Sequence, residues 1–277
     1  MSKILHVDHE FEKLVTRRDD VDLTVAALEI ARDLEPELDF SQTLDWIRDR
    51  GRQLLCEVAR FTDAADVVEE LSKCLAGEHG LGGDMDCYAN PESSFLNRVV
   101  ETKRGIPISL SLVYIAVAKE IGLELHGISS PAHFLTRAET DAGPVFIDCF
   151  AGGRILSERE AHAFVASLIN DDPDQFRHAF EPARPRTIII RVLHNLKALF
   201  AQQEKWASAW HVQNRLSRLQ PSSYRERRDL AVISLRANRP GAAINLLNSL
   251  LKSCPDTDRD FLFQSLRDAE RQMACWN

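Results

Sequence analysis

The chain has 277 residues and a formal net charge of −8, with 44% hydrophobic and 27% charged residues. This balance excludes a wholly disordered chain, and the length is enough for two modest domains. The near-apolar run from Ile106 to Ala118 is too short to span a bilayer. Acidic residues interrupt the N-terminus where a signal peptide needs an apolar stretch. We therefore expect a cytoplasmic protein without a membrane partner.

The cysteines form no CxxC pair, so neither a zinc site nor a thioredoxin-like motif is indicated. Without an export signal we interpret them as reduced thiols. The sequence predicts no metal and no cofactor. The six cysteines are Cys56, Cys74, Cys87, Cys149, Cys254 and Cys275.

The first 80 residues predict helices. Apolar residues recur near helical spacing from Val25 to Leu34, from Leu44 to Val58 and from Val67 to Leu75. A loop rich in glycine should follow these helices. Its glycines are Gly77, Gly80, Gly82 and Gly83.

Two further helices are predicted before residue 122. Ser93 or Ser94 is a candidate N-cap for a short helix that ends near Val100. Pro107 suits the first turn of a longer helix, and Gly122 suits its left-handed C-terminal stop. The longer helix is apolar on all sides, which predicts burial on most faces.

Short strands should follow the long helix. They are expected at Leu123 to Ile128, His133 to Arg137 and Val145 to Phe150, with a hairpin turn at Asp141-Ala142-Gly143. Gly152–Gly153 should end this region.

A helix is predicted from Glu158 to Ile169, and a linker from Asp171 to Pro185. After the linker, residues recur at a separation of 34 positions, in a helix, turn, helix, proline order that resembles tetratricopeptide repeats. Two copies and a final helix from Phe261 to Met273 are expected. The matching pairs are Leu196 with Leu230, Ala209 with Ala243, and Pro221 with Pro255.

The stretch NPESSFLNRVVETKRGIPISLSLVYIAVAKEIGLELHGISSPAHFLTRAETDAGPVFIDCF resembles the core of the transglutaminase-like superfamily. Active relatives have a cysteine at the helix start, where the helix dipole favours a thiolate, with a histidine base and an orienting aspartate on the strands. His133 matches the histidine and Asp148 the aspartate. The position that should be cysteine is Pro107, which has no nucleophile.

More closely, residues 20–275 resemble the bacterial SirB-type (YchA) family. GIPISLS, a PxHFL-like segment and an FID-F-GG-like segment occur together in that family, and the chain carries all three. Cys149 departs from the pattern, because such proteins usually have proline after the aspartate. The resemblance supplies no secure biochemical role.

Three residues are candidate substitute nucleophiles. Ser111 lies one helical turn after Pro107 on the same face, whereas Ser109 points elsewhere. Both are explained more simply as small residues in a closely packed helix. Cys149 should point to the opposite face from Asp148 and is better explained as a packed core thiol.

His133 and Asp148 have a non-catalytic explanation as well, as a buried polar clamp or a ligand-binding remnant of a triad. Asn90, Asn97 and Arg104 flank the start of the long helix and are candidate residues for the same cleft, although loop surface is the favoured explanation for them.

The predicted fold is α+β and mainly helical. A helical N-terminal segment and a transglutaminase-like (cysteine-protease-like) core occupy residues 1–182, with the core at about 90–157, and a helical-repeat domain occupies residues 183–277.

The favoured function is a non-catalytic regulatory module that binds a protein or peptide. The alternative is a hydrolase or acyltransferase that uses Ser109, Ser111 or Cys149. The last 95 residues hold 16 Lys and Arg against 8 Asp and Glu. Because these basic residues are scattered and the overall pI is about 5.6, nucleic-acid binding is the least favoured role.

Overall fold

The computed structural model describes residues 7–169 and 178–275, which form two compact units. Unit 1 covers Met1–Val192 and unit 2 covers Leu193–Asn277. The division falls within helix α8 (Pro185–Gln202), whereas the sequence placed it after Pro182. Part of the predicted linker, residues 170–177, lies outside the described residues.

Unit 1 begins with helices whose starts are fixed by aspartate side chains. Asp22, Asp39 and Asp63 each accept hydrogen bonds from backbone N–H groups in the first turn that follows, which satisfies donors without an intrahelical partner. These helices and the short turns after them are α1 His9–Val15, α2 Leu23–Arg32, α3 Phe40–Val58, α4 Ala64–Ser72, η1 Lys73–Glu78, η2 Met85–Tyr88, η3 Pro91–Ser94 and α5 Leu96–Thr102.

Helix α6, Pro107–Glu120, is the predicted buried helix. It packs against α2, α3 and α5 and also contacts the strands β1 and β2. Pro107 occupies its first turn, and Gly122 follows its end with a φ of 76°. Only Ile115, Lys119 and Glu120 among its residues are not buried, which agrees with the absence of a polar face.

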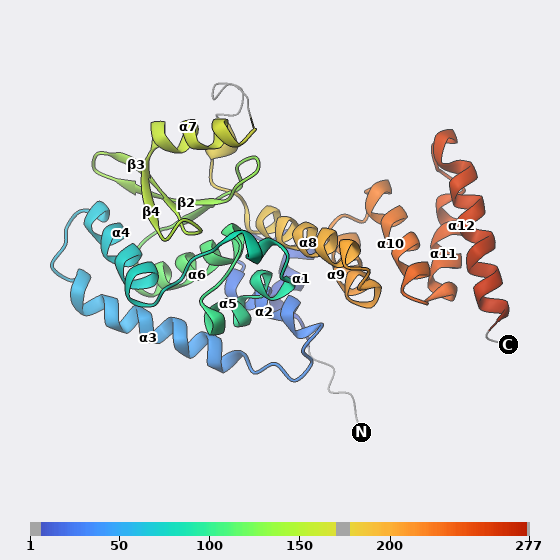
Figure 1. Cartoon of the computed structure of the whole chain (residues 1–277), viewed down its shortest axis with the longest axis horizontal. Helices are drawn as coiled ribbons and strands as arrows, with labels where there is room; N and C mark the ends of the chain where they lie inside the picture. The colour runs from blue at the N-terminus through green and yellow to red at the C-terminus, as the bar shows by residue number, and fades with distance from the viewer. Residues whose placement is uncertain (1–6, 170–177, 276–277) are drawn as a thin grey trace. The chain divides into compact units, whose positions relative to one another are not determined.

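The sheet is antiparallel throughout, with the order β1-β2-β3-β4. Its strands are β1 His126–Ile128, β2 Leu135–Thr140, β3 Gly143–Asp148 and β4 Arg154–Ser157. Helix α7, Glu158–Ile169, covers one face, and α6 lies on the other side (Figure 1). Phe146 and Leu156 pack with Val165 of α7, whereas the α6 side receives Cys149.

The sequence analysis missed the fourth strand. β4 pairs with β3 beyond Gly152–Gly153, where the region was expected to end. The two glycines have φ values of 69° and 74° and instead form the turn that brings the chain back. Leu156 is buried while Ile155 is 37% exposed, so the short strand carries only one inward apolar residue as a signal.

Two other local predictions were wrong. Ser93 and Ser94 lie in η3, because Asn90 caps that turn, and the N-cap residue of α5 is Phe95. Gly77 is not in the loop, because α4 continues through a π-helical turn, η1, as far as Glu78.

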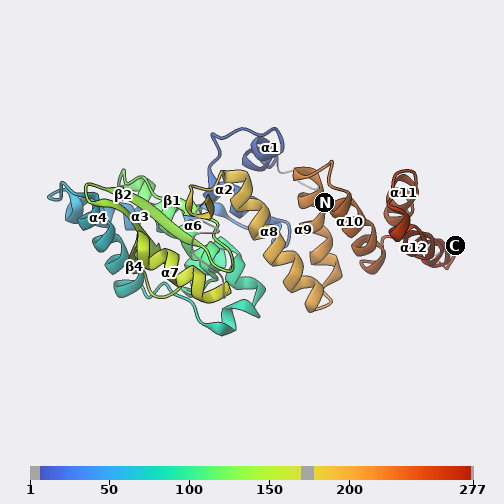
Figure 2. The same cartoon turned by 90° about the horizontal axis from the view of Figure 1, so that it is seen from above.

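Unit 2 is helical in every described element and follows the predicted repeat. The helices after α8 are α9 Trp206–Leu219, α10 Tyr224–Arg236, α11 Pro240–Leu250 and α12 Asp256–Ala274. Helix α12 starts earlier than the predicted Phe261. Neighbouring helices pack in chain order, and α11 and α12 lie side by side (Figure 2). Ala209 and Ala243, one repeat apart, are both fully buried.

The fold is thus α+β and mainly helical, as predicted. No helix in the described part of the chain is both long enough and apolar enough to cross a membrane.

Unit 2 contains a buried polar network around Glu226, which is 3% exposed. Gln213 Nε2 donates to the Glu226 backbone oxygen and to its Oε2, both at 2.8 Å, and Lys197 Nζ donates to the same Oε2 at 3.1 Å. Burial alone would raise the pKa of Glu226, but the hydrogen bonds from Gln213 and Lys197 outweigh burial and lower it.

We expect Glu226→Ala to lower the free energy of unfolding at pH 7 by about 3 kcal/mol, because it leaves Gln213 and Lys197 without this buried partner. A carboxyl whose folded pKa is lowered stabilises the fold above its unfolded pKa, and this contribution is lost as the pH falls through the folded pKa. The difference in unfolding free energy between the variant and the parent should therefore shrink when the pH falls below the ordinary glutamate pKa of about 4.3. Urea unfolding at several pH values measures it.

The exposed Glu270→Ala serves as the control, with an expected change within about 0.5 kcal/mol. A Glu226→Ala effect equal to that of the control at pH 7 would contradict the prediction.

Candidate functional site

His133 and Asp148 meet at one end of the sheet. The His133 Nε2 atom lies 3.0 Å from Asp148 Oδ1, and both residues are buried. Asp148 ends β3. The sequence had placed His133 on a strand, but it lies in the loop before β2. The pairing depends on the hairpin, which aligns Thr136 of β2 with Ile147 of β3.

The Asp148 carboxylate is fixed by its own turn. Its Oδ1 accepts hydrogen bonds from the backbone N–H groups of Phe150 and Ala151, each at 3.2 Å, in addition to its contact with the His133 ring. An acceptor at Nε2 assigns the proton of a neutral imidazole to that nitrogen, which leaves the lone pair on Nδ1. The serine-protease triad has the reverse arrangement, with the aspartate at Nδ1 and the base at Nε2, so the free nitrogen of the His133 ring is Nδ1.

The loop that carries His133 is held by a residue that the sequence analysis did not identify. Arg191, in α8 before the end of unit 1, donates to the backbone oxygens of Ser130 and His133, both at 2.7 Å, and to Ser129 Oγ at 3.0 Å. Burial lowers the pKa of this guanidinium, so the three bonds offset a desolvation cost. The signal in the sequence was a single charge within the apolar run from Ile188 to Leu193.

Within the same loop, Ala132 has a φ of 57°, a left-handed conformation that is unfavourable for alanine. The hydrogen bond from the His133 N–H to the Pro131 oxygen, 2.7 Å long, spans this residue. The clamp from Arg191 therefore holds a locally strained turn that orients the imidazole.

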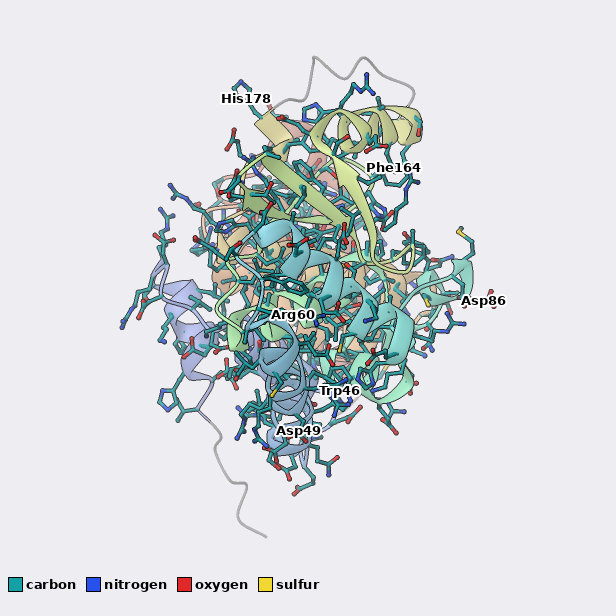
Figure 3. The ribbon with its side chains drawn as sticks, turned by 90° about the vertical axis from the view of Figure 1, so that its left-hand side faces the viewer. Trp46, Asp49, Arg60, Asp86, Phe164 and His178 are labelled. Carbon is teal, nitrogen blue, oxygen red and sulfur yellow. The ribbon has the colours of Figure 1, made fainter. Side chains whose placement is uncertain are left out.

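Aromatic rings surround the pair. Phe164 of α7 and Phe150 meet the His133 ring edge to face, with centroids 5.1 and 6.2 Å away, and Tyr88 of η2 lies 5.4 Å from Phe150. Phe164 is labelled on α7 in Figure 3. Burial raises the pKa of Tyr88, and the charge of Asp148 raises it further. Because Tyr88 is still 45% exposed, the buried pair has an aromatic rim that reaches solvent.

The start of α6 carries Pro107 at the position where the resemblance predicts a cysteine. Pro107 is buried in the first turn, after Ile106 as N-cap residue, and no side chain caps this helix end. Ser109 lies two residues further along the helix. Its hydroxyl is 2.5 Å from the Ser93 carbonyl oxygen and 3.0 Å from that of Ile106. This hydroxyl is therefore occupied by backbone acceptors.

The other two substitute nucleophiles lie together in the core. Ser111 and Cys149 are fully buried. The Cys149 thiol lies 3.8 Å from the Thr136 hydroxyl, and the Ser111 hydroxyl has no hydrogen-bond partner among the described residues. Burial raises the pKa of Cys149 to about 12, which opposes thiolate formation. Cys149 belongs to the α6 side of the sheet, whereas the His133 ring faces Phe164 of α7.

The three flanking polar residues, Asn90, Asn97 and Arg104, form contacts with residues other than His133 and Asp148. Asn90 Oδ1 accepts the Glu92 N–H at 3.0 Å, and Asn97 Nδ2 donates to Glu35 Oε2 at 3.2 Å. Arg104 lies 3.4 Å from Asp84 in an exposed ion pair. Asn90 and Arg104 are exposed, as a surface position predicts, whereas Asn97 lies in α5 and is half-buried.

Comparison with known proteins agrees with this arrangement. The transglutaminase-like superfamily profile matches residues 24–194, and a tetratricopeptide repeat profile matches residues 196–271. The chain therefore belongs to the transglutaminase-like superfamily and carries tetratricopeptide repeats after that domain.

Bacterial proteins also match most of the chain. It is 32% identical to a UPF0162 protein of Xylella fastidiosa (strain Temecula1) over 238 residues, which are 85% of each chain. It is also 22% identical to the UPF0162 protein YchA of Escherichia coli (strain K12) and 20% identical to the Protein SirB1 of Salmonella typhimurium, each over 72% of this chain and 74% of the relative. The resemblance to the SirB-type (YchA) family is confirmed.

We expect Arg191→Ala to lower the free energy of unfolding of unit 1 by about 3 kcal/mol, because the buried loop oxygens of Ser130 and His133 lose a charged donor. The His133 ring should then lose its fixed orientation, which a change in its NMR resonances and faster amide exchange in residues 129–133 would detect.

The exposed Arg159→Ala is the control and should change neither stability nor the His133 resonances. Unchanged amide exchange in the Arg191→Ala loop would show that the strained turn does not depend on this clamp.

Proposed function

We propose that the protein is a non-catalytic binding module in which the former catalytic cleft and the repeats each recognise a peptide segment of a protein partner. The observation that carries this proposal is the combination of an oriented His133–Asp148 pair with proline at the nucleophile position, Pro107. Acyl transfer by such a triad requires a nucleophile that forms the acyl intermediate. Imidazole and carboxylate alone supply polar recognition instead.

The aromatic rim around the His133–Asp148 pair supports binding. Tyr88, Phe150 and Phe164 present aromatic surface around buried polar groups, which is the composition of many recognition sites. Tyr88 contributes a phenol that has the negative Asp148 and the positive Arg191 nearby. A peptide backbone, with donors and acceptors beside apolar side chains, matches this mixture.

The repeats offer a second surface. A groove between α10 and α12 is lined by Val232, Ile233 and Phe261 together with the ion pair of Arg228 and Asp258. Phe261 is 50% exposed and also lines the adjoining part of the groove. An extended or helical segment with an apolar side chain beside a charged one fits this chemistry.

Peptides selected by phage display on the tag-free protein should bind one of these two surfaces. We expect Tyr88→Ala or Phe261→Ala to weaken the selected peptides at least about tenfold in fluorescence titrations, as for a central interface residue. Met85→Ala, in the same turn as Tyr88 and 77% exposed, and Phe263→Ala, 46% exposed beside Phe261, are matched controls that should leave affinity unchanged.

Equal affinities in all four variants, or a selection that yields no saturable binder, would contradict the binding proposal at these surfaces.

We also expect no transglutaminase or thiol-protease turnover above background. The assay uses amine-donor and peptide substrates on the parent and on Ser109→Ala, Ser111→Ala, Cys149→Ala and His133→Ala. Removing the nucleophile from such a triad removes nearly all of the rate, so all five proteins should behave alike. Parental turnover that disappears in His133→Ala and in one serine or cysteine variant would establish the alternative hydrolase or acyltransferase and identify its nucleophile.

A further inference from the structure

A second cluster of chemically reactive side chains lies away from the cleft, at the end of α4. The helix continues into the π turn η1, and the His79 N–H donates to the Cys74 carbonyl oxygen at 3.0 Å, five residues back. Bonds of this i to i+5 kind widen the turn and bring residue i+5 over residue i. Both Glu78 and His79 are therefore brought beside Cys74.

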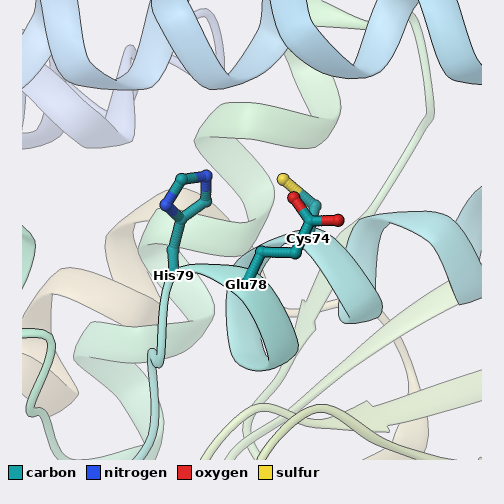
Figure 4. Close-up of side chains that lie close together, drawn as sticks. All are labelled: Cys74, Glu78 and His79. Carbon is teal, nitrogen blue, oxygen red and sulfur yellow. The ribbon is translucent and has the colours of Figure 1, made fainter.

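The three side chains point from this turn toward α3 (Figure 4). One ligand atom from each of Cys74, Glu78 and His79 lies within 4.8 Å of the other two. Cys74 is buried, His79 is half-buried and Glu78 is exposed. The cluster is thus closed at the sulfur and open to solvent at the carboxylate.

We propose that Cys74, Glu78 and His79 bind one divalent metal ion of the zinc type. A thiolate, an imidazole and a carboxylate are the ligands that zinc takes in proteins, and a mixed sulfur, nitrogen and oxygen set disfavours magnesium and calcium. Three protein ligands leave a fourth tetrahedral position, which a water molecule would fill because the cluster is open to solvent at Glu78.

An outer residue already holds two of the three ligands. Gln53 of α3 donates through Nε2 to Glu78 Oε2 at 3.0 Å, and its Oε1 lies 3.3 Å from His79 Nε2. Trp46 also lies on α3, one turn before Arg50. Its ring meets the His79 ring edge to face, with the ring centroids 5.9 Å apart. Such outer partners orient metal ligands and reduce the reorganisation that binding requires.

Charges of both signs surround the cluster: Lys73 pairs with Glu70 at 2.7 Å, and Arg50 and Lys103 act on His79. The carboxylates of Glu57, Glu70 and Glu78 all act on the Cys74 thiol, while Arg50 opposes them.

The protonation states are compatible with binding at neutral pH. Burial lowers the pKa of His79, which keeps the imidazole neutral and able to ligate. Burial, with Glu78 and Glu57, raises the pKa of Cys74 to about 11, so the thiol must release its proton to solvent when the metal–sulfur bond forms.

The test titrates tag-free, chelator-treated full-length protein with Co²⁺ and then competes it with Zn²⁺. We expect a thiolate-to-cobalt charge-transfer absorption that saturates at one Co²⁺ per chain and is removed by Zn²⁺. Glu78→Gln and His79→Gln lie on the open side and should fold normally by circular dichroism. Each should weaken Co²⁺ by more than the roughly 10- to 100-fold loss expected for Gln53→Ala, which removes only an outer partner.

Cys56→Ser, an exposed cysteine on α3, and Glu69→Gln, an exposed acid on α4, are matched controls that should bind Co²⁺ as the parent does. The absence of a charge-transfer absorption in the parent would overturn the proposal. So would an absorption that survives both Glu78→Gln and His79→Gln, or one that disappears with Cys56→Ser.

Discussion

The organisation of unit 1 depends on one constraint, which is that helix α6 has no polar face. A helix of this composition is stable only when other elements remove it from water on most sides. Helices α2, α3 and α5 cover part of it, and the strands β1 and β2 cover another part. Because the sheet must lie against α6, the hairpin that brings Asp148 to His133 is held at a fixed distance from the helix that starts at Pro107.

The same packing separates the chemically useful groups into two environments. The α6 side of the sheet is dry and contains Ser111 and Cys149, where burial raises the pKa of the thiol. On the other side, His133 and Asp148 are buried but have the aromatic rim and the Arg191 clamp around them. His133 is oriented by Asp148, while the Ser109 hydroxyl is bonded to backbone oxygens and Ser111 and Cys149 are enclosed in the core. This separation is the physical basis of the binding proposal.

Local conformations that break regular periodicity contribute the remaining features of unit 1. The left-handed Ala132 turns the chain into the histidine loop, and the glycines at 152 and 153 turn it back into β4. The π turn at residues 73–78 changes which side chains share a face of the helix, and it brings His79 over Cys74. Ala132 costs backbone energy that the surrounding contacts must offset, whereas the two glycines adopt their positive φ without steric strain.

The sequence by itself determined the helical segments, the burial of α6, the 34-residue repeat and the pairing of His133 with Asp148, because these follow from hydrophobic periodicity and from motifs with a chemical requirement. It did not reveal β4, where one inward leucine was too weak a pattern, or the clamp from Arg191, whose partners are backbone atoms distant in the chain. It also gave no indication of Cys74, Glu78 and His79 as a set, since that spacing matches no metal motif on an α-helix. Only the tertiary structure decided these features, because long-range hydrogen bonds and a π turn depend on neighbours that local sequence does not specify.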